Sequence, residues 1–76
     1  EYQPWIAAWR GDASATDFLF NTTKQAKSTA KISVWTITDA GVVTEVTGTA
    51  TLATSKITIA GPLPATTSVV ALYELA

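Results

Sequence analysis

The second half of the chain, from Lys31 onward, alternates apolar and polar residues over short runs that are separated by turn residues. Alternation with a period of two is typical of β-strands that bury one face. Threonine occurs fourteen times in the sequence, and its β-branched side chain favours extended backbone over helix. The pattern therefore predicts strands over residues 31–38, 42–47, 49–53, 57–60 and 68–75.

Three parts of this region make more specific predictions. The tripeptide DAG at residues 39–41 lies between two strand-like runs, which predicts a tight hairpin with Gly41 in a left-handed conformation. Residues 31–38 shift the phase of their apolar positions near Val34, which predicts either burial on both faces or a β-bulge. Residues 68–75 are apolar on both faces, so we expect this strand to be central in its sheet or covered on both sides.

The first thirty residues follow a different pattern, since five of the seven aromatic residues lie before Asn21. Residues 16–22 alternate around two phenylalanines and predict a strand. Residues 4–9 (PWIAAW) are compatible with a single helical turn that starts at proline, or with an extended arm. Residues 23–31 are polar and rich in lysine, which predicts a solvated loop, with a short helix as the alternative.

Together these segments predict an all-β fold, a small antiparallel sandwich or barrel of about six short strands with an aromatic N-terminal arm. The arm is expected to span residues 1–15, and a single β domain is expected to span residues 16–76. A chain of 76 residues is long enough for one such domain, although its core is necessarily thin.

Composition indicates how such a small domain is stabilised. The sequence contains no cysteine and no histidine, which excludes disulfide bonds and the usual zinc or haem ligand sets. Hydrophobic residues make up 47% of the chain and charged residues only 14%, so we expect part of the apolar surface to be buried against other subunits. The absence of methionine predicts that Glu1 follows processing or excision from a longer chain.

The charged residues do not indicate a catalytic or metal-binding site. The six acidic residues are scattered singly, and no histidine or cysteine is present to act as base or nucleophile. We therefore predict that the protein is not an enzyme and binds neither a cofactor nor a metal. A net charge of −1 argues against nucleic acid as a partner, although Lys24, Lys27 and Lys31 are close in sequence. No apolar run reaches the length of a membrane-spanning helix, so no membrane partner is expected.

The aromatic N-terminal segment provides the strongest candidates for a binding site. Aromatic residues are favoured at subunit interfaces, although core packing is an alternative that the sequence does not separate from this interpretation. The candidates for a subunit interface are Tyr2, Trp5, Ile6, Trp9, Phe18 and Phe20. A stacking site for a glycan or a host receptor is the other alternative, with contact residues Trp5, Trp9, Arg10 and Asp12.

The tripeptide RGD at residues 10–12 matches a short cell-attachment signal. Such a signal acts only when it lies at an exposed loop tip. We favour the alternative interpretation, in which Gly11 ends a local turn while Arg10 and Asp12 are ordinary polar residues.

Several features together suggest a function. The short Thr/Val-rich strands, the lack of Cys and His, and the proline-containing loop before the last strand resemble small β domains of phage virions and bacterial surface proteins. We therefore expect a structural assembly protein in a virion or at an extracellular surface, such as a capsid decoration or cement protein, or a tail or fibre part of a bacteriophage. Its partners would be copies of itself or a larger coat or fibre protein. The alternative is an immunoglobulin-like binding module of a surface or fibre protein, which contacts glycans or a host receptor through loops 10–17 and 61–67.

Overall fold

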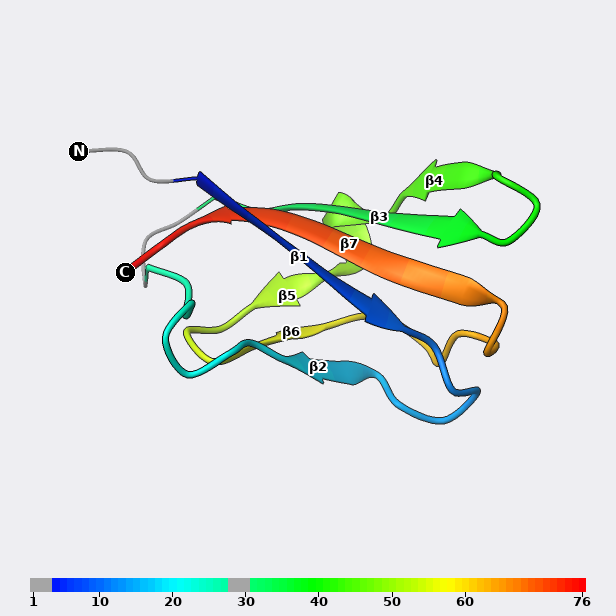
Figure 1. Ribbon diagram of the computed structural model, residues 1–76, viewed down its shortest axis with the longest axis horizontal. Coiled ribbons are helices and arrows are strands. Elements are labelled where there is room, and N and C mark those ends of the chain that lie inside the picture. Colours follow the sequence, from blue (N-terminus) through cyan, green and yellow to red (C-terminus); the bar gives the residue numbers. More distant parts are fainter. Residues whose placement is uncertain (1–3, 28–30) are drawn as a thin grey trace.

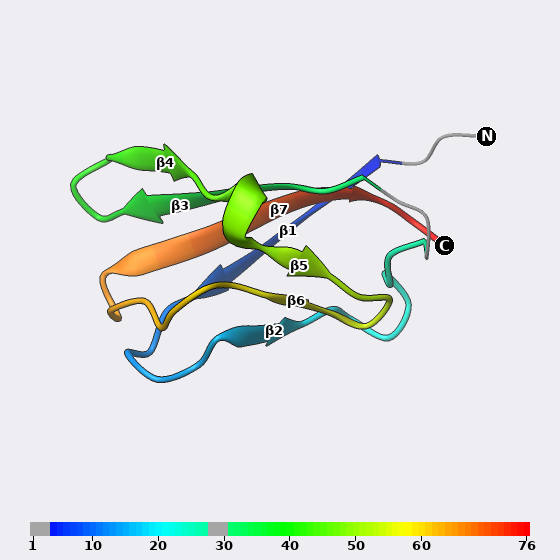
Figure 2. The same cartoon turned by 180° about the vertical axis from the view of Figure 1, so that it is seen from behind.

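The computed structural model describes residues 4–27 and 31–76, which form seven β-strands and one short 3₁₀ turn (Figures 1 and 2). In chain order the elements are β1 (Pro4–Arg10), β2 (Asp17–Leu19), β3 (Ser33–Thr38), β4 (Val43–Glu45), η1 (Thr47–Thr49), β5 (Thr51–Leu52), β6 (Lys56–Thr58) and β7 (Thr67–Glu74). The strands build two antiparallel sheets, one in the order β1-β7-β3-β4 and the other in the order β2-β6-β5. The predicted all-β class is confirmed, and within the described residues the two sheets do not close into one barrel.

The strands of the sequence prediction are all present, and one further strand was not expected. Each of the six predicted runs overlaps one of the strands β2 to β7. The seventh strand, β1, comes from the segment that was predicted to be an arm or a helical turn. The helical turn is wrong for residues 4–10. These residues are extended, as in the alternative, and form a fully paired strand of the four-stranded sheet.

β1 is a strand because its neighbour satisfies its backbone. Each of its seven residues faces a residue of β7, from Pro4 opposite Glu74 to Arg10 opposite Ser68. A single helical turn over the same residues would close few hydrogen bonds while fixing as much backbone, so it is not stable alone. Proline is tolerated at the first position of a strand that lies at the edge of a sheet.

The core lies between the two sheets and takes residues from both. Ile57 of β6 contributes from the three-stranded sheet, Val34 of β3 and Val69 of β7 contribute from the four-stranded sheet, and all three are fully buried. β7 lies between β1 and β3, and alternate residues along it are buried and partly buried. Of the two predicted alternatives for this strand, the central position in the sheet is therefore confirmed. The buried apolar residues are Phe18, Phe20, Ala26, Val34, Ile57, Ile59, Val69, Ala71 and Tyr73.

A cluster of four aromatic rings joins β1 and β7 to the segment around β2. The Phe20 ring stacks on Tyr73, with the ring centroids 4.4 Å apart. The Trp9 ring lies 5.8 Å from Phe18 and 5.6 Å from Phe20. The Trp9 indole N–H donates a hydrogen bond to the carbonyl of Leu19 at 2.9 Å, so this partly buried ring also has its polar group satisfied.

The segment that was predicted to be a solvated loop, residues 23–31, is partly tied to the core. Ala26 is fully buried and forms an isolated antiparallel bridge to the residue that follows β7. The Tyr73 hydroxyl donates to the carbonyl of Lys24 at 2.6 Å, and burial raises the pKa of that hydroxyl. Residues 28–30 of the same prediction lie outside the described residues.

β3 and β4 form the predicted hairpin. Gly41 has a φ of +90°, and its N–H donates to the carbonyl of Thr38 at 2.9 Å. The Thr38 N–H in turn donates to the carbonyl of Val42 at 3.0 Å, so the left-handed glycine at this turn is confirmed. Pairing of β3 with β7 is continuous from Ser33 to Thr38, so the phase shift near Val34 reflects apolar residues on both faces rather than a bulge.

Candidate assembly surface

The outer face of the four-stranded sheet carries the side chains that do not point into the core. The odd-numbered residues of β7 from Thr67 to Tyr73 are buried, so Val70 and Leu72 between them point outward. Residues opposite each other in neighbouring strands share a face, which places Trp35 of β3 beside Val70 on the outer face. The same registers extend this face to β1 and β4. We define its apolar side chains as the outer patch, which consists of Ile6, Ala8, Trp35, Ile37, Val43, Val70 and Leu72.

The outer patch is arranged in rows that cross the strands. One row runs from Ala8 through Val70 to Trp35, and in the next row Ile37 lies opposite Val43. With about 4.8 Å between strands and about 6.8 Å between alternate residues, the outermost Cα atoms are about 14 Å apart in each direction. A contiguous apolar area of this size on a small domain is typical of an interaction surface.

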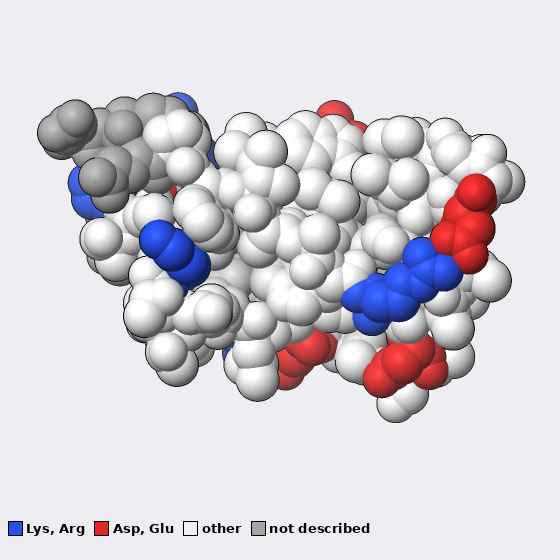
Figure 3. Space-filling model, in the orientation of Figure 1, with Lys and Arg blue, Asp and Glu red and all other residues white. Residues whose placement is uncertain are grey.

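Several members of the outer patch are open to solvent. Ile6 and Val43, at the two edges of the sheet, expose 65% and 59% of their surface. Trp35, Ile37 and Val70 are half-buried, but none of these five residues belongs to the core or packs against it. The side of the molecule on which β1 lies is mostly uncharged over β1 and β7 (Figure 3).

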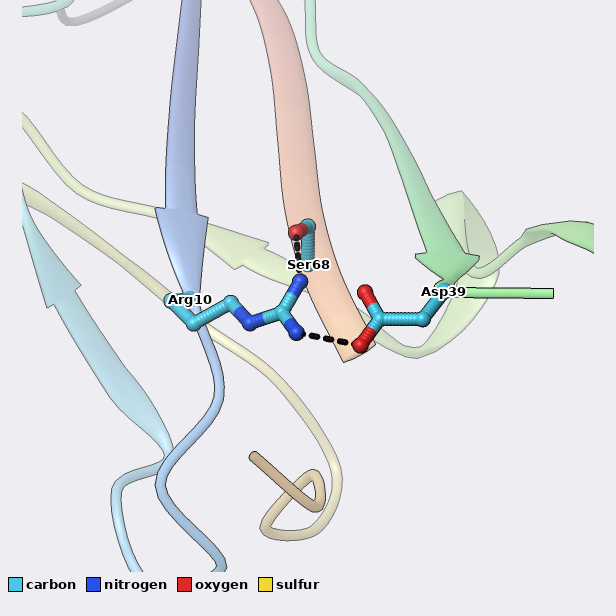
Figure 4. Close-up of polar contacts among 3 residues, drawn as sticks. All are labelled: Arg10, Asp39 and Ser68. Atoms are coloured by element: carbon cyan, nitrogen blue, oxygen red, sulfur yellow. Dashed lines mark hydrogen bonds and ion pairs between the residues drawn. The ribbon is translucent and has the colours of Figure 1, made fainter. Parts of the chain in front are cut away.

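An ion pair borders the outer patch at the end of β1. The Arg10 guanidinium reaches across β7, donating to the Asp39 carboxylate at 2.6 Å and to the Ser68 hydroxyl at 3.2 Å (Figure 4). The hydrogen bond from Arg10 lowers the pKa of Asp39, and the same bond raises the pKa of Arg10. Both side chains are about half exposed, so the pair contributes little to stability. Its effect is to neutralise two charges beside an apolar surface.

The RGD tripeptide belongs to this border and is not an exposed loop tip. Gly11 is buried, and its N–H donates to the carbonyl of Thr67 at 2.8 Å. A side chain at Gly11 would bring its Cβ within 2.5 Å of the Pro64 carbonyl oxygen, so only glycine fits there. The Asp12 carboxylate accepts hydrogen bonds from backbone N–H groups two and three residues later, which lower its pKa. The tripeptide therefore forms a structural turn.

Two of the predicted interface residues lie in the core, and a third, Trp9, is partly buried beside them. Phe18 and Phe20 are 5% and 6% exposed and belong to the core, and Trp9 packs against both rings. Burial leaves the Phe18 and Phe20 rings almost no surface for contact with another subunit, whereas Trp9 keeps part of its surface exposed. The core alternative therefore applies to Phe18 and Phe20, and the interface assignment of Trp9 stays a prediction.

The other predicted interface residues are distributed differently. Ile6 is part of the outer patch. Trp5 is 37% exposed and lies on the opposite side of β1, where the Lys24 ammonium sits 4.5 Å from its ring centroid. Tyr2 lies outside the described residues.

The four residues predicted to contact a glycan or receptor do not converge. Trp5 and Arg10 lie near opposite ends of β1, about 17 Å apart along the strand, and on opposite faces of the sheet. Trp9 is partly buried against Phe18 and Phe20, and the Asp12 carboxylate accepts hydrogen bonds within its own turn. An exposed ring with polar groups around its rim is the arrangement that a sugar platform needs, and these four residues do not form one.

Sequence reasoning missed most of the outer patch. Trp35, Ile37 and Val70 were placed in strands but not on a binding surface. The signal was present, because residues 31–38 and 68–75 are apolar on both alternating faces. When two sheets share one core, each strand has only one face toward that core, so the second apolar face is left outside.

The outer face of the three-stranded sheet is polar by comparison. The Lys56 ammonium donates to the Asp17 carboxylate at 2.9 Å, and the Thr58 hydroxyl donates to the same carboxylate at 2.8 Å. Both hydrogen bonds lower the pKa of Asp17, the one from Lys56 having the larger effect. Thr51 continues this polar row on β5, while Leu19 is a large apolar residue on this face and is 70% exposed.

Residues 4–27 and 31–76 contain no group of three or more His, Cys, Asp or Glu side chains placed to hold a metal, and no pocket for a small ligand is found among them. No helix in the described part of the chain is long and apolar enough to cross a membrane. Comparisons with protein-family models, curated proteins and solved structures give no significant match.

Proposed function

We propose that this protein is a structural assembly protein that binds neighbouring subunits through the outer patch and performs no chemical step. The observation that carries the proposal is the outer patch itself, in which seven apolar side chains share one sheet face. The polar residues that the same registers place on this face are Arg10, Ser33, Glu45, Ser68 and Glu74. Removing apolar surface from water contributes about 25 cal/mol per Å², so covering this face stabilises an assembly.

The proposal includes a finer description of the fold, in which the two sheets face each other as a small sandwich. It is supported by the core, since buried residues from both sheets form one cluster. In a sandwich each sheet has one covered and one outward face. The outer patch is then a surface that the fold itself does not need to bury.

The specific setting we propose is a virion, where the chain serves as a capsid decoration or cement protein, or as a tail or fibre part of a bacteriophage. Its partners are copies of itself or a larger coat or fibre protein. The support comes from the sequence, whose short threonine-rich strands and low charge resemble such domains. A chain without disulfide bonds also gains from an array, because binding to neighbours stabilises the folded state by mass action.

Sedimentation velocity from micromolar to millimolar concentration tests the proposal, with an average mass that is expected to rise with concentration. Val43→Lys places an ammonium group at an exposed position of the outer patch. It should move self-association to concentrations about tenfold higher, because an unpaired charge at an interface is costly to desolvate. Thr51→Lys is the matched control, since it adds the same charge to an exposed strand residue of the other sheet.

The control variant should associate like the unmodified chain. A chain that stays monomeric throughout the concentration range would contradict the proposal. Equal effects of Val43→Lys and Thr51→Lys would also contradict it, because they would show that the outer patch is not the contact surface.

A further inference from the structure

β1 is the outermost strand of its sheet, so one side of its backbone has no strand partner among the described residues. In an antiparallel pair, alternate residues exchange hydrogen bonds with the neighbour, and the residues between them face away. The Gly11 N–H donates to the carbonyl of Thr67 in β7, which fixes the phase of this alternation. The residues whose backbone N–H and C=O groups face the open side are therefore Ile6, Ala8 and Arg10.

The other sheet edges are shorter or partly blocked. β2 and β4 have three residues each and β5 has two, against seven in β1. The Leu19 carbonyl of β2 already accepts the indole N–H of Trp9, and β4 carries the exposed carboxylate of Glu45. β1 has no charged side chain before Arg10. A long, uncharged edge strand is the kind of edge that pairs with another strand.

The outward residues of β1 are complementary to themselves when a second copy runs antiparallel. If Ala8 faces Ala8 of the second copy, then Ile6 faces Arg10, and each of these pairs can exchange two backbone hydrogen bonds. On the outer face, the two small alanine side chains meet at the symmetry axis. The aliphatic part of each Arg10 then lies beside an Ile6, while its guanidinium remains free to reach Asp39.

The inner side chains of β1 fit the same register. Trp9 of one copy faces Ala7 of the other, and Trp5 faces Gly11. Each large ring is thus opposite a small residue, so the two strands can approach without two indoles competing for the same space. A register shifted by two residues loses this match, because it sets Trp9 opposite either Trp9 or Trp5.

We propose that β1 pairs antiparallel with β1 of a second copy of this chain, across a two-fold axis at Ala8, so that two four-stranded sheets become one eight-stranded sheet. This inference rests on the proposed assembly function and identifies one contact within it. The pairing adds about six backbone hydrogen bonds and joins two outer patches into one larger apolar face. One strand pair buries little area, so the dimer is weak and depends on concentration.

Single cysteines test the register directly, because the chain has no cysteine of its own. Ala8→Cys puts two thiols on the symmetry axis, where opposite Cα atoms lie about 5.5 Å apart and can form a disulfide. Ile6→Cys puts its two thiols about 13 Å apart, beyond disulfide reach. In a glutathione redox buffer, Ala8→Cys should cross-link about tenfold faster than Ile6→Cys at equal concentration.

A mixture of Ile6→Cys with Arg10→Cys completes this experiment. The two variants should cross-link to each other, because the register places residues 6 and 10 opposite one another, and each should cross-link poorly alone. Cross-linking of Ile6→Cys as fast as Ala8→Cys would overturn the proposed register. Failure of Ala8→Cys to exceed Ile6→Cys would overturn the pairing.

Backbone donors provide a second test that does not involve thiols. Ala8→Pro removes an N–H that faces the open edge of β1, and Glu45→Pro removes the corresponding edge N–H of β4. Sedimentation should show dimerisation weakened about tenfold by Ala8→Pro and unchanged by Glu45→Pro, with far-UV circular dichroism confirming that both variants fold. Equal effects of the two variants would overturn the proposal.

The two proposals fail in different ways. If the unmodified chain associates and Val43→Lys weakens association, but Ala8→Cys does not cross-link, the β1 pairing is wrong and the assembly function stands. If the unmodified chain remains monomeric and Ala8→Cys does not cross-link, both proposals are wrong.

Discussion

The two sheets bury alternate residues in the same way, but their outer faces differ in polarity. Each sheet buries alternate residues in the shared core. On the outside, the four-stranded sheet presents apolar rows, such as Ala8 beside Val70 and Trp35. The three-stranded sheet presents polar rows, such as Asp17 opposite Thr58, with an ion pair to a neighbouring lysine.

This difference in polarity distinguishes residues that the fold needs from residues that serve another role. Polar residues on the outer face of the three-stranded sheet show that this fold tolerates them there, as antiparallel sheets with one solvated face usually do. The apolar residues of the outer patch are therefore not explained by the core. The contact with another protein that we propose would account for them, and the following predictions test this separation.

The largest loss of stability is expected from truncating a side chain in the core that both sheets line. Ile57→Ala empties space at a fully buried position of β6 and should lower the free energy of unfolding by about 2 to 5 kcal/mol. A chain of this length has a free energy of unfolding of about 4 to 11 kcal/mol, so the variant retains little stability. Ile6→Ala, at an outward position that is 65% exposed, should change the free energy of unfolding by less than about 0.5 kcal/mol.

Urea denaturation at micromolar concentration measures both isoleucine variants as monomers. Similar losses at Ile57 and Ile6 would contradict the assignment of inner and outer faces.

A smaller loss is expected at the turn where the chain passes from one sheet to the other. Gly11→Ala forces a Cβ to within 2.5 Å of a backbone oxygen and should cost about 1 to 3 kcal/mol. Gly48→Ala is the control, because nothing lies within 4 Å of the added Cβ, and it should have an effect of less than about 0.5 kcal/mol. Thermal unfolding of the two variants compares them, and a neutral Gly11→Ala would mean that this turn is not packed as described.

Acidification should lower the stability of the protein through one aspartate on each sheet. Hydrogen bonds from Arg10 and Lys56 lower the pKa values of Asp39 and Asp17 in the folded state, below the ordinary value of 3.8. The unfolded chain therefore binds protons at higher pH than the folded chain does. The resulting stability is present above about pH 4 and is lost as the pH falls below that value.

Urea denaturation from neutral to strongly acidic pH measures this loss. Asp17→Asn and Asp39→Asn should each flatten the acid limb of the profile. A profile that is unchanged in both variants would show that these hydrogen bonds do not form in solution.

The smallest effects on folding are expected from the two lysine variants that distinguish the outer faces. Val43→Lys and Thr51→Lys both change exposed side chains, so each should alter the free energy of unfolding by less than about 0.5 kcal/mol at micromolar concentration. Their effects on association should nevertheless differ, as described above. A large loss of stability in Val43→Lys alone would mean that this residue serves the fold rather than a contact.

The sequence predicted strands well where apolar alternation or a turn residue was local, as in β7 and the Gly41 hairpin. It did not predict β1, because residues 4–10 become a strand only through pairing with β7, more than fifty positions away. It also named Phe18 and Phe20 as interface candidates and left core packing open, since aromatic residues are favoured in cores and interfaces alike. The choice between those environments depends on how the two sheets face each other, which is a tertiary property.

The most direct test of the central claim maps association onto the two faces by amide NMR. Between micromolar and millimolar concentration, we predict that amide signals shift for residues of the outer patch and the β1 edge, such as Ala8, Val70 and Trp35. Signals from the outer face of the three-stranded sheet, such as Asp17 and Thr58, should stay in place. Shifts that centre on the three-stranded sheet, or no shifts at all, would contradict the account.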